Sequence, residues 1–108
     1  MTDRELLELA AKAAGIKYEK YYDVDDGSLC IVRGQRDFEL WNPLSDDGDA
    51  FRLAVKLQLD ILQFGILMAM VQYDTGEIKV FDERHDNDAY KATRRAIVRA
   101  AAEIGKTK

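Results

Sequence analysis

Residues 41–57 read Trp41-Asn42-Pro43-Leu44-Ser45-Asp46-Asp47-Gly48-Asp49-Ala50-Phe51-Arg52-Leu53-Ala54-Val55-Lys56-Leu57. The run contains the only Trp and the only Pro of the chain, followed by an acidic turn. Pro43 lacks a backbone N–H and so ends a strand, whereas Asp46 or Asp47 offers a side-chain oxygen to the free N–H groups at a helix start. The run therefore predicts a strand that ends at Trp41 and a helix that follows at once.

The helix predicted after the acidic turn has one apolar side. Its stripe consists of Ala50, Leu53, Ala54 and Leu57, widened by Phe51 and Val55. Trp41 ends the alternating strand 38–41, and the widened side of the helix needs an apolar partner. We therefore expect a buried Trp41 that packs near Phe51 and Val55.

Two further helices are predicted at the ends of the chain. Thr2 followed by Glu5 is a capping-box pattern, and apolar residues then recur at helical spacing until Gly15. Residues 85–88 offer caps to a last helix that would end at Gly105. The face predicted for this last helix consists of Tyr90, Thr93, Ile97, Ala100, Ala101 and Ile104.

Five strands are predicted between these helices. Residues 16–24 and 28–32 form one hairpin around Asp25-Asp26-Gly27, and residues 38–41 add a strand. Apolar residues 61–71 run through to a turn at Asp74-Thr75-Gly76, after which residues 77–81 return. Because residues 66–71 are nearly all apolar, we expect a central strand that is covered on both faces.

These elements predict an α+β fold. With 108 residues the chain fits a single domain, residues 1–108. A two-sided central strand requires a helical layer on each face, so the expected architecture is a three-layer α/β/α sandwich. It would contain three helices and one mainly antiparallel sheet of about five strands.

Composition places the chain among soluble globular proteins, with 47% hydrophobic and 33% charged residues. We expect no signal peptide, and the longest apolar run, residues 64–71, is too short to span a membrane. The single cysteine, Cys30, cannot form an internal disulfide and sits among apolar residues. We therefore expect a buried, inert thiol and a cytoplasmic protein.

Three pieces of the chain, Met1–Ile16, Trp41–Leu57 and Ala92–Gly105, resemble the phage ABA sandwich domain family. They occur in order and include both ends and the middle of the chain. The resemblance implies a sheet sandwiched by helices and an origin in a phage or prophage of a bacterial host. It brings no catalytic residue, because the family's biochemical role is unassigned.

No constellation of catalytic or metal-binding residues is predicted. The Asp-rich turns at residues 23–27 and 46–49 do not fit a calcium loop, and one His with one Cys cannot supply a zinc site. His85 has carboxylate neighbours and could act as a general base, but a solvated loop residue is the preferred interpretation. We expect no enzyme activity, no metal and no cofactor.

Basic residues on the last helix raise a different function. Lys91, Arg95 and Arg99 recur every four residues with Arg94 beside them, a pattern that could follow the phosphates of a nucleic acid. The net charge of −4 and the absence of interleaved aromatic residues favour a solvated face instead. Nucleic-acid binding is therefore the alternative function.

The preferred function is binding of another protein. Residues 17–22 mix charges with Tyr18, Tyr21 and Tyr22, as an edge strand does. These tyrosines are the candidate anchors for a weak homodimer or for an unidentified partner, such as a protein of the bacterial host. With the phage or prophage origin that the family resemblance implies, we expect a small accessory protein that acts without catalysis.

Overall fold

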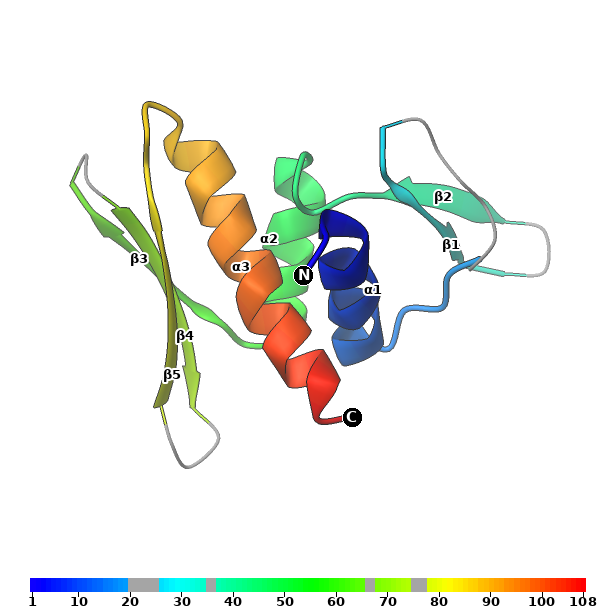
Figure 1. Cartoon of the computed structure of the whole chain (residues 1–108). Coiled ribbons are helices and arrows are strands. Elements are labelled where there is room, and N and C mark those ends of the chain that lie inside the picture. Colours follow the sequence, from blue (N-terminus) through cyan, green and yellow to red (C-terminus); the bar gives the residue numbers. More distant parts are fainter. Residues whose placement is uncertain (20–25, 35–36, 66–67, 75–77) are drawn as a thin grey trace.

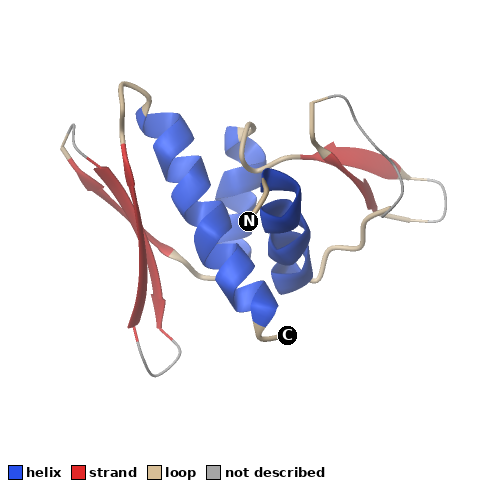
Figure 2. Ribbon diagram, viewed as in Figure 1, coloured by secondary structure: helices blue, strands red, loops and turns tan. Residues whose placement is uncertain are grey.

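The computed structural model describes residues 1–19, 26–34, 37–65, 68–74 and 78–108. Helices and strands alternate along it, and Figures 1 and 2 show their arrangement. The elements are α1 (Asp3–Ala14), β1 (Leu29–Val32), β2 (Phe38–Trp41), α2 (Asp47–Lys56), β3 (Asp60–Phe64), β4 (Met68–Asp74), β5 (Ile78–Arg84) and α3 (Ala89–Lys106). The α+β class and the three helices are confirmed.

Each helix begins at a polar cap that the sequence predicted. Thr2 Oγ1 accepts from the backbone N–H of Glu5 at 3.1 Å, and Asp46 Oδ2 accepts from that of Asp49 at 2.8 Å. Asp88 does the same for α3. These bonds satisfy N–H groups that have no partner within the helix.

The central run also folds onto itself. The Asp49 carboxylate accepts from the backbone N–H of Asn42 at 2.9 Å, which ties the end of β2 to the first turn of α2. Pro43 is buried between the two elements. Trp41 is only 3% exposed, so its predicted burial is confirmed.

The strands belong to two separate antiparallel sheets. β1 pairs with β2, and residues 17–19 lie along the other side of β1 through the bridge between Tyr18 and Ile31. β3, β4 and β5 form the second sheet in that order. The prediction of one five-stranded sheet is therefore wrong. Apart from that bridge, the predicted strand 16–24 lies mostly outside the described residues.

The apolar run after Leu59 forms two strands instead of one. Gly65, with φ +57°, interrupts it, so β3 and β4 become neighbours in the sheet. β4 is the middle strand, as predicted, but only one of its faces is covered. Ala69, Val71 and Tyr73 are buried toward α3. The three helices lie between the two sheets, which is not the predicted order of layers (Figure 1).

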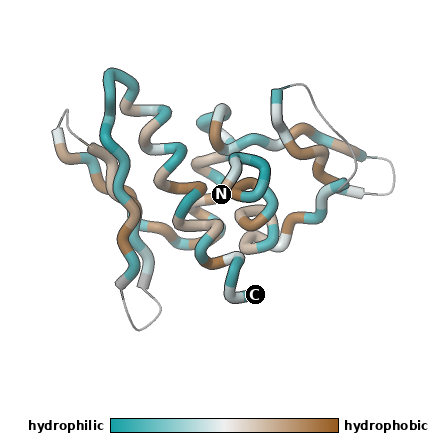
Figure 3. Tube along the Cα trace, in the orientation of Figure 1, coloured by the Kyte–Doolittle hydropathy of each residue, from teal (hydrophilic) through white to brown (hydrophobic). Residues whose placement is uncertain are grey.

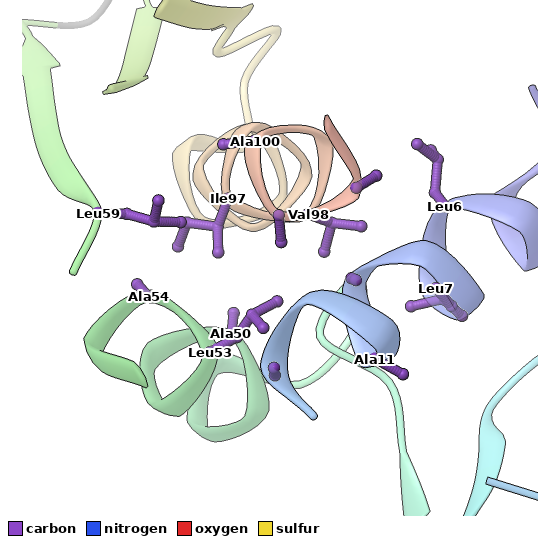
Figure 4. Close-up of a cluster of buried hydrophobic side chains, with 14 of the residues drawn as sticks. Leu6, Leu7, Ala11, Ala50, Leu53, Ala54, Leu59, Ile97, Val98 and Ala100 are labelled. Carbon is purple, nitrogen blue, oxygen red and sulfur yellow. The ribbon is translucent and has the colours of Figure 1, made fainter. Parts of the chain in front are cut away.

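The core lies where the three helices meet. Figure 4 shows Leu53 of α2 and Val98 of α3 pointing into the space that the helices share, with Leu59 at its edge. Figure 3 shows that hydrophobic residues also follow the strands of both sheets. Phe51 and Val55, predicted to widen the buried stripe of α2, face outward instead, because Ala50, Leu53 and Ala54 already fill the contact with α3.

α1 and α3 approach each other closely. A Cβ built at Gly105 would overlap the carbonyl oxygen of Leu9, so only glycine fits at this crossing. Gly105 does not end α3, which continues to Lys106. The glycine predicted to be a helix terminator is thus a packing residue.

Candidate partner-binding groove

A groove of about 490 Å³ lies between α2, α3 and β3. Most of its surface comes from apolar side chains. It is lined by Asp47, Ala50, Phe51, Ile61, Gln63, Ala89, Tyr90, Thr93, Arg94 and Ile97. We call this feature the α2–α3 groove.

Two large aromatic rings flank the groove and remain exposed. Phe51 is 64% exposed and Tyr90 is 71% exposed. Tyr90 was predicted to share a face of α3 with Thr93 and Ile97, and all three line the groove, but the Tyr90 ring itself lies outside the core. The sequence carried one usable signal: Phe51 and Val55 are flanked by Arg52 and Lys56, which is typical of the boundary of a helical stripe.

One end of the groove is fixed by Arg94. Its Nε donates to the carbonyl oxygen of Leu44 at 2.9 Å, and its Nη1 lies 2.7 Å from Asp47 Oδ1. These contacts hold the start of α2 against α3. Arg94, predicted as a nucleic-acid contact, therefore positions the two helices that form the groove.

Polar contacts connect the groove to β3. Gln63 Nε2 donates to Thr93 Oγ1 at 2.7 Å, and Gln63 Oε1 lies 2.9 Å from Nε2 of His85. His85 is 7% exposed, so the expectation of a solvated residue is wrong. The imidazole supports the wall of the groove through Gln63, because a buried ring nitrogen needs a hydrogen-bond partner.

Arg95 and Arg99, two of the other basic residues of α3 in the predicted stripe, also face carboxylates. Arg95 contacts Asp3 at 3.1 Å, and Glu83 of β5 pairs with both Arg95 and Arg99. Arg99 also lies 5.7 Å from the centroid of the Phe81 ring. Lys91 is exposed and forms no ion pair with any residue that the structure describes. The stripe is thus largely neutralised within the molecule.

The tyrosines predicted as partner anchors do not form a described cluster. Tyr18 is half-buried against the core, and its hydroxyl donates to Glu8 Oε2 at 2.8 Å. Burial and this hydrogen bond raise the pKa of Tyr18. Tyr21 and Tyr22 lie outside the described residues. The contact of Tyr18 with α1 indicates a structural role.

Asp26, in one of the Asp-rich turns predicted to be structural, accepts a local hydrogen bond. Asp26 Oδ1 accepts from the backbone N–H of Ser28 at 2.9 Å. Hydrogen bonds to the side chain and to the backbone of Ser28 lower the pKa of Asp26. Cys30 is buried, as predicted. Within the described ranges, no three His, Cys, Asp or Glu side chains come together as a group that could hold a metal ion.

Comparisons with known proteins give no relative. No family model, no curated protein and no solved structure matches this chain. The resemblance to the phage ABA sandwich family stays a prediction.

Of the helices described, none combines the length and the apolar character needed to cross a membrane.

Proposed function

We propose that this protein acts without catalysis, by binding another protein through the α2–α3 groove. The observation that supports the proposal is the pair of exposed rings, Phe51 and Tyr90, beside an apolar hollow. Aromatic residues next to apolar hollows dominate the energy of many protein interfaces. The fixed Arg94–Asp47 pair keeps the two helices in place, which lowers the cost of ordering the surface on binding.

The partner is a protein that presents apolar side chains. The charges at the end of the groove, Asp47 and Arg94, already neutralise each other, so a strongly charged ligand finds no complementary field there. Following the family resemblance, the proposal includes a phage or prophage origin and a partner inside the bacterial host.

A photo-crosslinking amino acid at position 51 tests the proposal. It should capture a distinct protein in host cells, whereas the same amino acid at position 38 should not. Phe38 is a matched control because it is 55% exposed but lies on β2, in the other sheet.

The captured protein is then purified and titrated. Phe51→Ala and Tyr90→Ala should each weaken its binding at least about tenfold, whereas Phe38→Ala should leave it unchanged. Equal crosslinking from positions 51 and 38, or binding that is insensitive to both groove substitutions, would contradict the proposal.

A further inference from the structure

The sheet formed by β3, β4 and β5 has a second face that looks away from the helices (Figure 1). We call it the outer face. The strand register places nine of its side chains in three rows. The rows are Phe64, Met68 and Arg84; Leu62, Met70 and Asp82; and Asp60, Gln72 and Val80.

The apolar side chains of the outer face are unusually open to solvent. Leu62, Phe64 and Val80 are 39%, 47% and 49% exposed, and Met68 and Met70 are partly exposed beside them. None of the helices and strands that the structure describes covers them. A contiguous apolar surface of this kind on a sheet marks an interaction site.

Two opposite charges occupy diagonally opposite corners of the outer face. Asp60 begins β3, and Arg84 ends β5. Both are exposed, and neither forms an ion pair with another described residue. Arg94, Arg95 and Arg99 all have carboxylate partners, so Arg84 differs from the arginines of α3.

The two corner charges are complementary across a two-fold axis, and the third charge of the outer face, Asp82, then faces Gln72. A two-fold axis that lies in the contact plane, along the diagonal from Phe64 to Val80, exchanges the two charged corners. Asp60 of each copy then faces Arg84 of the other copy. The same operation places Leu62 against Met68 and Met70 against Met70. Such a contact uses the same patch on both copies, which is the rule for two-fold dimers.

We propose that the outer face is a homodimer interface, occupied by the outer face of a second copy of this chain. In this dimer the β3–β5 sheet of one copy crosses the β3–β5 sheet of the other copy at a steep angle, as in orthogonal sheet packing. The surface is distinct from the α2–α3 groove. It leaves the groove free to bind a partner.

Sedimentation velocity across the micromolar range tests the dimer. The wild-type protein should pass from monomer to dimer as its concentration rises, and Leu62→Lys should abolish the dimer. Phe38→Lys, at an exposed position of the other sheet, should leave it unchanged. Far-UV circular dichroism checks that each variant is folded.

A charge exchange tests the geometry. Asp60→Arg alone and Arg84→Asp alone should each weaken the dimer several-fold, because like charges then face each other. The double variant D60R/R84D should recover the wild-type affinity. A wild-type monomer at every concentration would overturn the proposal. So would a dimer that survives Leu62→Lys, or a double variant whose dimer is no stronger than those of the single variants.

Discussion

Trp41 connects the end of β2 to the core of the molecule. Its ring is 3% exposed, so Trp41→Ala removes a large apolar side chain from a packed site. We expect the substitution to lower the free energy of unfolding by about 3–5 kcal/mol. Urea denaturation measures the change.

Phe38→Ala is the matched control for this substitution, because Phe38 lies on the same strand with 55% of its surface exposed. Its effect should stay within about 0.5 kcal/mol. Equal effects of the two substitutions would show that Trp41 is not a core residue.

Tyr18 makes the stability sensitive to alkaline pH. Burial and the hydrogen bond to Glu8 raise its pKa above the ordinary value of 10.0. At a pH between 10.0 and the raised pKa, the Tyr18 hydroxyl keeps its proton in the folded chain but has lost it in the unfolded chain. Folding stability therefore decreases as the pH rises above about 10. Below that pH the contribution of Tyr18 is fully present.

Tyr18→Phe should therefore make the loss of stability above pH 10 less steep. Burial raises the pKa of Tyr73 as well, so the double variant with Tyr73→Phe should show the smallest slope. Urea midpoints measured as a function of pH provide the test. If the dependence of the urea midpoint on pH is unchanged in both variants, folding does not raise the pKa of these two hydroxyl groups.

The exposure of the groove's aromatic rings and the burial of His85 could not be predicted from the sequence. Phe51 and Tyr90 have apolar rings, and periodicity assigns such residues to the core. The exposure of Phe51 follows from which side of α2 packs on α3, and that of Tyr90 from its place in the first turn of α3; both are tertiary properties that local spacing does not contain. His85 was misassigned for a related reason, because its partner Gln63 lies 22 residues away along the chain.

The crossing of α1 and α3 depends on a residue without a side chain. Gly105→Ala places a methyl group on the carbonyl oxygen of Leu9, so the helices must separate. We expect a net loss of about 1–3 kcal/mol, even though alanine favours a helix. Thermal and urea denaturation measure it.

Gly48→Ala in α2 is the control for this substitution. There a Cβ would meet the end of the Arg52 side chain at 3.1 Å, which can move, and the capping oxygen of Asp46 at 3.2 Å, which needs to shift only slightly. Stability should change much less than in Gly105→Ala. A Gly105→Ala protein as stable as the Gly48→Ala protein would contradict the close helix crossing.

Helices were predictable at this scale, but the grouping of strands was not. A cap and an apolar stripe are local, so Thr2, Asp46 and Asp88 mark helix starts without knowledge of the fold. Sheet membership depends on contacts between distant residues. Residues 66–71 were predicted as a central strand covered on both faces, whereas Gly65 separates β3 from β4 and one face of β4 stays partly open.

For the whole molecule, the helices form the middle layer and each sheet keeps an uncovered face. The α+β class follows from the order of the elements, because it requires only their types. The order of the layers depends on which faces are covered, and the continuous apolar composition of β4 suggested cover on both. The two proposed contact surfaces, the α2–α3 groove and the outer face of the β3–β5 sheet, are surfaces that this arrangement leaves exposed.

Charge is also a property of the whole molecule, and it determines the expected behaviour toward nucleic acids. The net charge is −4, and three of the four basic residues predicted to bind phosphates already contact carboxylates of the same chain. Binding of DNA or RNA would have to break these pairs and overcome the overall repulsion.

We therefore expect no change in the fluorescence anisotropy of labelled duplex or single-stranded nucleic acid when the protein is added, at about 50 mM or about 200 mM salt. The triple variant K91A/R95A/R99A should behave like the wild type, whereas salt-sensitive binding that this variant abolishes would favour the nucleic-acid alternative over protein binding.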